Sequence, residues 1–171
     1  MKRKPYGWVV PAIALLAVAG CRRQPPPSLP AQPPAQVLDN FQLQEMENGR
    51  KSMTLDAVQG RLYDSDHHAD LDSPFVTFYK NGAISSTMKA PVGRVDMETH
   101  AIEAWNGVTV VTSDSATLTT ERLSYDPKKK KIFSNTHVHL ERPNSVTDGE
   151  SLVADPGLTS VIISHQRVKM R

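Results

Sequence analysis

The sequence predicts an all-β fold of stacked short antiparallel strands, and three observations support this prediction. From Val37 onward, apolar and polar residues alternate with a period of two, which is typical of strands with one dry and one wet face. The Asn-Gly pairs at 48–49 and 81–82 are typical of hairpin turns. No segment beyond the N-terminal apolar run shows the period of an amphipathic helix.

A unit of about thirty residues recurs four times, and each copy joins two short β-type runs. The copies open on Arg61-Leu62, Arg94-Val95, Arg122-Leu123 and Ser151-Leu152. They close on Val76-Thr77-Phe78, Val108-Thr109-Val110, Val138-His139-Leu140 and Val161-Ile162-Ile163. A unit of this size cannot bury its own apolar face, so the copies are expected to stack around one shared interior.

The N-terminus has the pattern of a lipoprotein signal peptide. A basic start at residues 2–4 precedes an apolar run from Trp8 to Ala19, and small residues lead to Cys21. As a helix this run reaches only about 18 Å, against a hydrocarbon core of about 30 Å. We therefore predict a signal peptide over residues 1–20 and acylation of Cys21 as the lipid anchor. The alternative is a short anchor that is not cleaved.

A proline-rich stalk is predicted between this anchor and the folded domain. Six of the thirteen prolines lie within residues 21–36, where extended polyproline geometry gives about 3.1 Å per residue. Such a stalk could hold the domain, residues 37–171, up to about 50 Å from a bilayer.

Charge and cysteine content exclude several classes of protein. Loss of the basic start would turn the formal net charge of +2 slightly negative, so nothing indicates a nucleic-acid binder. The basic run Lys128–Lys131 is interpreted as a solvated loop tip, with contact to anionic head groups as the alternative. Cys21 is the only cysteine, so the domain has no disulfide and depends on its core.

The strands are predicted in order from the turns. Three-residue loops at 48–50 and 81–83, each with a glycine bulge, give two hairpins. The predicted partners are Leu43 with Leu55, Phe41 with Ala57, and Val76 with Met88. Later strands are predicted near Thr99–Val111, Ala116–Tyr125, Lys131–Glu141, Ser145–Ala154 and Thr159–Met170, with breaks at Asp126-Pro127 and 155–157.

Twelve mostly aliphatic positions in these strands are predicted to line the interior. Alternation alone leaves two possibilities, an open trough and a closed core, and it favours the closed core. The candidate groove residues are Leu62, Val76, Phe78, Val95, Ile102, Val108, Val110, Leu123, Phe133, Val138, Leu140 and Leu152.

Five segments, in this order, make the chain similar to the LptC family over about Val37–Met170. They are Val37–Leu43, Leu71–Tyr79, Ala90–Val95, Trp105–Val110 and Leu118–Asp126. LptC-type proteins are periplasmic bridge subunits of the lipopolysaccharide export machine. The resemblance implies an open, twisted β-jellyroll whose interior groove takes the acyl chains of lipopolysaccharide. It also implies two partners, the inner-membrane ABC transporter and a soluble periplasmic bridge protein of similar fold.

The anchor departs from the family pattern, because many members have a spanning helix where this chain has a lipobox. Arg22 follows Cys21, and by resemblance to enterobacterial sorting rules this is not an inner-membrane retention signal. The resemblance nevertheless favours a periplasmic domain held at the inner membrane. Near the C-terminus, Val161, Ile162 and Ile163 are a candidate edge strand for pairing with a partner sheet, the alternative being an ordinary terminal strand.

No catalytic, cofactor or metal site is predicted. The segment Asp64–Asp72 fails as a calcium loop, because Ala69 and Phe75 stand where Gly and Glu are needed, and a polar turn is favoured over a zinc site. His137 and His139 flank Val138 and should face solvent. The sequence has no nucleophile elbow, so hydrolase chemistry has little support. It has no phosphate-binding loop either, so the energy for transport would come from a partner.

The sequence therefore predicts a carrier that binds lipid without covalent chemistry. Two alternatives remain open: a passive structural envelope lipoprotein with a closed β core, and an envelope enzyme that uses Asp64–Asp72 on glycans. If the groove is open, Val110→Asp should weaken lipid capture without unfolding the chain.

Overall fold

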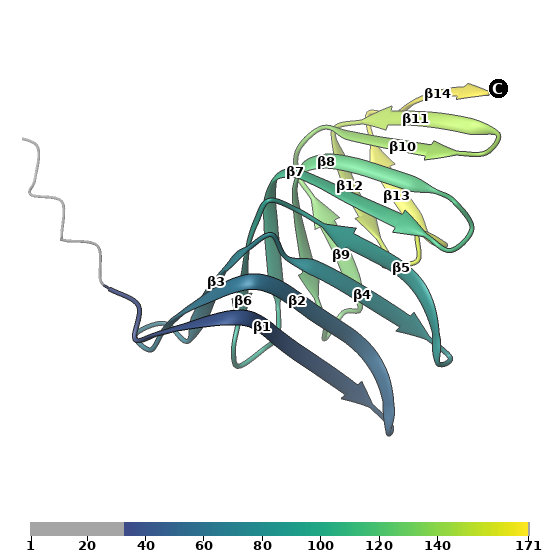
Figure 1. The fold of residues 1–171 in the computed structure, drawn as a ribbon. Coiled ribbons are helices and arrows are strands. Elements are labelled where there is room, and N and C mark those ends of the chain that lie inside the picture. Colours follow the sequence, from purple (N-terminus) through teal and green to yellow (C-terminus); the bar gives the residue numbers. More distant parts are fainter. Residues whose placement is uncertain (1–32, 171) are drawn as a thin grey trace, which may run out of the picture. The chain divides into compact units, whose positions relative to one another are not determined.

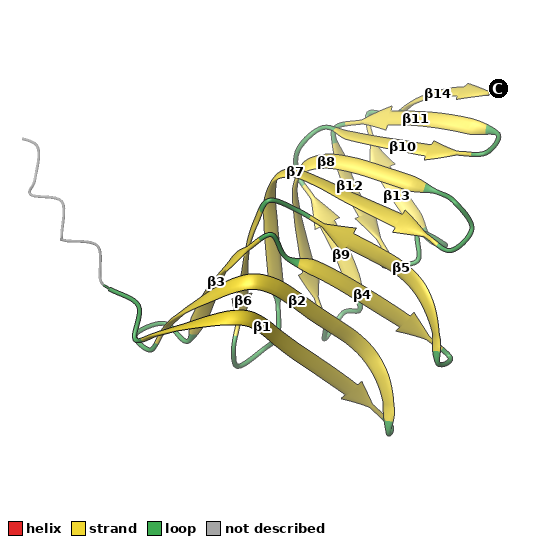
Figure 2. Cartoon of the chain, in the orientation of Figure 1, coloured by secondary structure: helices red, strands yellow, loops and turns green. Residues whose placement is uncertain are grey.

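The computed structural model describes residues 33–170, whose regular elements are all strands (Figure 2). The all-β prediction is confirmed. Within these residues no helix is long and apolar enough to span a bilayer. The predicted signal peptide, Cys21 and most of the stalk lie outside the described residues. The strands are β1 Gln36–Glu47, β2 Arg50–Tyr63, β3 His68–Asp72, β4 Phe75–Lys80, β5 Ala83–Lys89, β6 Val92–Asp96, β7 Ile102–Thr112, β8 Thr117–Asp126, β9 Lys131–Ser134, β10 Val138–Arg142, β11 Ser145–Gly149, β12 Ser151–Ala154, β13 Val161–Ser164 and β14 Arg167–Met170.

Strand pairing shows that the chain runs up and down in antiparallel passes, each paired with the next. β1, β2, β7 and β8 are single long passes. The other passes each consist of two short strands: β3 with β4, β5 with β6, β9 with β10, β11 with β12, and β13 with β14. For example, β2 pairs with β3 over one half and with β4 over the other. The topology is thus a simple meander of long passes.

A crease across the middle of these passes folds the single 14-stranded sheet into two halves, which we call sheet one and sheet two (Figure 1). Sheet one contains, in order, β1, β2, β4, β5, β7, β8, β10, β11 and β14. Sheet two contains β1, β2, β3, β6, β7, β8, β9, β12 and β13. The four long strands belong to both sheets, so they join the two along the crease.

Residues with positive φ mark the crease. Asn40 in β1 has φ 53°, Ser73 between β3 and β4 has φ 52°, and His165 between β13 and β14 has φ 50°. In β7, Asn106 and Gly107 have φ 69° and 94°, and the register with β8 shifts there. A positive φ interrupts the pleat of a strand, and Asn and Gly adopt it most easily. The change of sheet is therefore encoded locally.

Three predicted strands were wrong in their extent. Lys131–Glu141 is divided into β9 and β10, Ser145–Ala154 into β11 and β12, and Thr159–Met170 into β13 and β14. In each case the division is where the chain passes from one sheet to the other. Apolar alternation continues through the crease, because both sheets direct side chains into the same interior, so the alternation conceals the break.

The predicted hairpin partners are confirmed, but the loops were wrong. Leu43 pairs with Leu55, Phe41 with Ala57, and Val76 with Met88. Both turns are two-residue turns, because the partners flanking them are Glu47 with Arg50 and Lys80 with Ala83. Both Asn-Gly pairs have positive φ, as a type I′ turn requires. The extra residues are Ser52 and Ser85, which bulge within the strands and give the same register offset as a longer loop.

The repeat predicted from the sequence corresponds to alternation between the sheets. In the first three copies the opening pair lies in sheet two and the closing triplet lies in sheet one. The fourth copy differs, because β12 and β13 form a hairpin within sheet two. In this copy the chain enters sheet one only afterwards, at β14, which pairs with β11.

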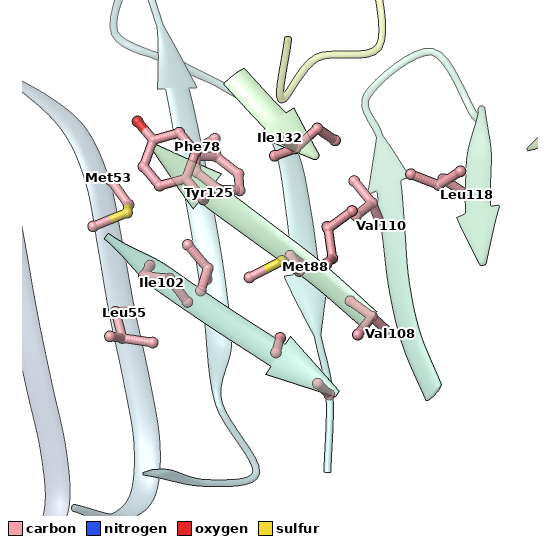
Figure 3. Packing of buried hydrophobic residues seen from close by; sticks show 14 of the residues in the cluster. Met53, Leu55, Phe78, Met88, Ile102, Val108, Val110, Leu118, Tyr125 and Ile132 are labelled. Atoms are coloured by element: carbon pink, nitrogen blue, oxygen red, sulfur yellow. The ribbon is translucent and has the colours of Figure 1, made fainter. Parts of the chain in front are cut away.

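The core lies between the two sheets and consists of cross-strand rows (Figure 3). In sheet one the row is Leu43, Leu55, Val76, Met88, Val110, Leu118 and Leu140. In sheet two it is Leu62, Ala69, Val95, Ile102, Tyr125, Ile132 and Ala154. Full burial of a large aliphatic side chain stabilises a fold by about 1.5–3 kcal/mol, so these rows hold the sheets together.

Gly149→Ala is expected to loosen β13, the last strand of sheet two. A Cβ at Gly149 would lie 2.1 Å from Ile163 Cγ2 and 2.9 Å from the Ser164 carbonyl oxygen. Relief of this overlap should cost about 1–3 kcal/mol in urea unfolding. Gly149→Ala should cost less in an Ile163→Ala background, because the nearer of the two contacts is gone. Equal costs in both backgrounds would show that the overlap has no effect.

Acid sensitivity is expected from the charged outer face of sheet two. Both Asp72 carboxylate oxygens accept hydrogen bonds from Arg61, at 2.7 and 2.8 Å, and these bonds hold the pKa of Asp72 below its ordinary value. The stabilisation is present above the unfolded pKa, near 4, and is lost as the pH falls through the lower folded pKa. Arg61→Met should therefore lower the Tm slightly at pH 7 and lower it less near pH 2. An equal loss at both pH values would contradict this.

Candidate functional site

The predicted groove residues, with one exception, belong to the interior between the sheets. Most of them are at most 3% exposed, and Leu62 is partly buried against the same cluster. The exception is Phe133, which lies on the outer face of sheet two beside Val153 and under the ammonium of Lys129. Its neighbour Ile132 takes the interior position, because side chains alternate along β9. The interior is thus packed with the chain's own side chains.

A cleft of about 720 Å³ opens on the side of the fold opposite the crease. Residues from the β1–β2 and β4–β5 hairpins of sheet one line it on one side. The β8–β9 turn and the β12–β13 loop of sheet two line it on the other. We call it the mouth cleft. Since both sheets contribute, the mouth cleft is the place where the space between them meets solvent.

Two aromatic side chains form the floor of the mouth cleft. Phe78 from sheet one and Tyr125 from sheet two meet edge to face, with ring centroids 4.8 Å apart (Figure 3). Burial, together with the charges of Glu45 and Glu47, raises the pKa of Tyr125 to about 12. The phenol therefore stays neutral at physiological pH, and the floor is apolar apart from this hydroxyl.

The rim of the mouth cleft is charged, and one ion pair crosses it. Lys130, in the β8–β9 turn of sheet two, pairs with Glu47 at the end of β1 in sheet one. Both side chains are about half exposed or more, at 63% and 49%. An exposed pair of this kind contributes about 0–1 kcal/mol, so it connects the sheets only weakly.

The β12–β13 loop covers the open side next to the mouth cleft, which the sequence did not predict. Its Leu158 is only 2% exposed although it is a loop residue, and its φ is 52°. Arg142 of β10 donates a hydrogen bond to the Leu158 carbonyl at 2.8 Å. Asp155 accepts a hydrogen bond from Thr159 Oγ1 at 2.8 Å within the loop. The only feature of the sequence that could have indicated this cover is the apolar Leu158 directly after the turn residues Asp155-Pro156-Gly157.

The other sequence candidates do not line the mouth cleft, and one of them, His68, is only 9% exposed. In the segment Asp64–Asp72, His68 Nδ1 lies 2.9 Å from Asp66, and its ring stacks on Tyr63. His137 and His139 face solvent as predicted, and both lie near Asp148. Between residues 33 and 170 no three His, Cys, Asp or Glu side chains are grouped as a metal site.

The candidate edge residues lie on the last strand of sheet two. Val161, Ile162 and Ile163 belong to β13, which pairs with β12. Ile162 is 68% exposed, whereas Ile163 packs against the core. At the other end of the meander, β1 pairs with β2. Within the described part of the chain, each of these strands has one unpaired side.

Comparison with known proteins decides the family. A family model described as lipopolysaccharide-assembly, LptC-related, matches residues 10–161. The chain belongs to this LptC-related family. The similarity to LptC proteins predicted from the sequence is thereby confirmed. The comparison with curated proteins gives no match.

A solved structure shows the same architecture. It is LptH of Pseudomonas aeruginosa, the LptA-homologous periplasmic component of the conserved lipopolysaccharide transport device. The TM-score is 0.54 at 11% sequence identity, and the match covers 70% of this chain and 93% of LptH. At that identity the likeness concerns the fold alone. The fold of this LptC-related chain is a β-jellyroll.

Proposed function

We propose that this LptC-related chain is the membrane-anchored periplasmic subunit that receives lipopolysaccharide from an inner-membrane ABC transporter. It then passes the lipid to a soluble periplasmic bridge protein of similar fold. Family membership supports the connection with lipopolysaccharide. The observation that carries the proposal is the folded sheet itself. Continuous strands join its two halves along the crease, and the apolar interior between the halves reaches solvent on the opposite side.

This geometry suits the transport of fatty acyl chains. Apolar surface costs roughly 25 cal/mol per Å² in water, so the chains need a dry path between membranes. Two sheets that share continuous strands along one side can separate on the other without loss of sheet hydrogen bonds. Acyl chains would enter at the mouth cleft and displace side chains such as Phe78 and Leu158. This chain need perform no covalent step.

The unpaired strand edges supply a way to continue the path. The edge of β13, with Val161, Ile162 and Ile163, would pair with the soluble bridge protein, and the edge of β1 would face the transporter. A partner strand added to such an edge forms backbone hydrogen bonds with it. The interior of the partner would then be continuous with the interior of this chain. Acylated Cys21 and the stalk would hold the domain in the periplasm at the inner membrane.

Photocrosslinking from the interior tests the proposal. Probes at Val76, Val108 and Val138, which are fully buried in sheet one, should capture lipopolysaccharide in cells. A probe at Lys129, which is 69% exposed, should not. Capture at none of the three interior positions in a folded protein would contradict lipid carriage.

A passive structural lipoprotein is the second candidate, and the tight packing favours it. Val95, Ile102 and Val108 are 0% exposed, as in a core that never opens. This candidate predicts no capture from any interior probe. An enzyme acting through Asp64–Asp72 would instead lose hydrolysis when Asp66 and His68 are both changed to Ala, while lipid capture persists.

A further inference from the structure

Exposed basic side chains surround the mouth cleft on both sheets. Arg50 and Lys51 follow the first hairpin turn, Lys80 precedes the second, and Lys130 lies in the β8–β9 turn. Within residues 33–170, the ion pair at this rim is that of Lys130 with Glu47, and the other three cations have none. An apolar floor therefore lies beside three basic groups that lack a carboxylate partner.

Among the described residues, no acidic residue of the cleft forms an ion pair with Arg50, Lys51 or Lys80. Asp155 is bonded within its own loop, to the Ser160 amide and the Thr159 hydroxyl. Glu47 is paired with Lys130. Glu45 has one carboxylate oxygen, Oε2, buried without a hydrogen-bond partner next to the floor. Arg50, Lys51 and Lys80 are therefore the exposed cations of the rim that remain without an ion-pair partner in the described residues.

The combination of an apolar floor and a cationic rim fits an amphiphile with an anionic head. We propose that the rim of the mouth cleft is a binding site for a phosphate monoester on the headgroup of the transported lipid. The phosphate displaces Glu47 from Lys130 and contacts Lys51 or Lys80. One acyl chain of the same lipid then lies on Phe78 and Tyr125. This inference rests on the proposed function and assigns the headgroup position within it.

The exchange at Lys130 follows from charge and exposure. A phosphate monoester carries about −1.5 to −2 charges at pH 7 and offers three acceptor oxygens, against one charge on Glu47. The bridge to Glu47 is solvent-exposed and therefore easily broken. Because Glu47 belongs to sheet one and Lys130 to sheet two, the same exchange removes a contact that holds the mouth closed. Headgroup binding and opening of the interior are thereby coupled.

The test measures capture by the full-length chain with a photoreactive p-benzoylphenylalanine at Phe78. The probes are lipid A with two phosphates and the same lipid with none. We expect the phosphorylated lipid to be captured about five- to tenfold more efficiently, as expected for a few exposed charge contacts. Lys130→Met should reduce this preference to about twofold. Glu47→Gln should increase capture of the phosphorylated lipid, because it frees Lys130.

Controls keep the result specific. Lys89→Met removes an exposed lysine of β5 that does not line the cleft, and it should preserve the preference. The comparison is repeated with the probe at Val76, deeper in the interior, and circular dichroism establishes that each variant is folded. Inorganic phosphate at the concentration of the lipid should not compete, because it lacks the acyl contact.

Each contrary outcome has a distinct meaning. Equal capture of both lipids, or an unchanged preference in Lys130→Met, would overturn the headgroup site and leave lipid carriage intact. Full competition by inorganic phosphate would assign the rim to free phosphate and overturn the headgroup proposal. Capture of neither lipid from Phe78 or Val76 would contradict the proposed function together with this site.

Discussion

Val110→Asp is expected to destabilise the domain strongly. Val110 is 1% exposed and lies between Met88 and Leu118 in the apolar row of sheet one. No described basic group forms an ion pair or hydrogen bond at this position, so the new carboxylate would be buried without compensation. Such a charge costs about 3–5 kcal/mol, a large share of the 5–15 kcal/mol that stabilises a typical domain. Urea unfolding followed by circular dichroism measures the loss.

The neighbouring residue supplies the control. Val111 is 40% exposed and faces outward from the same strand, so Val111→Asp should change stability by less than about 1 kcal/mol. If Val110→Asp remains as stable as Val111→Asp, the interior is wetter than the structure shows. The sequence-based expectation that Val110→Asp leaves the fold intact does not fit the packing around Val110. It assumed an open trough, whereas this position is fully packed.

A covalent link across the mouth cleft is expected to abolish lipid capture. Glu47 and Lys130 lie on opposite sheets and meet at their side-chain tips. With both changed to Cys, a reducible thiol cross-linker long enough to replace this contact would hold the sheets together. Capture from a probe at Val108 should then fall at least tenfold, since acyl chains need the sheets to part. Reduction of the cross-linker should restore capture.

A link within one hairpin is the matched control. Glu47 and Arg50 are cross-strand partners in sheet one, so cysteines at these positions can be joined without connecting the sheets. Capture should be the same before and after that link is reduced. If the inter-sheet link also leaves capture unchanged, lipid enters by another route, and the mouth cleft is not the entrance.

The fold was largely predictable because period-two alternation sets the strand register. The partners of Leu43 and Val76 follow from alternation and an Asn-Gly turn, even though the exact loop was wrong. The crease was not predictable in the same way. Its positive φ values fall on Ser73 and His165 as well as on Asn, and alternation of apolar residues continues through it. A sequence pattern that reports burial cannot show a change of sheet when both sheets bury the same face.

The interior was more predictable than the mouth cleft. Alternation identified the interior residues apart from Phe133, where the choice between two adjacent apolar residues was wrong and Ile132 lies inside. The cleft depends on segments up to about a hundred residues apart, the first hairpin and the β12–β13 loop, which meet only because the meander folds in two. No local sequence pattern indicates that these two segments lie side by side.

The distance across the mouth most directly tests whether the sheets part to take up acyl chains. Spin labels at Asn48 in the first hairpin turn and Lys128 in the β8–β9 turn, in a chain with Cys21 replaced by Ser, report it by pulsed electron resonance. Packed sheets lie about 10 Å apart, so entry of a layer of chains should lengthen the distance by about 5 Å when lipopolysaccharide is added. An unchanged distance with lipid bound would contradict opening along the crease.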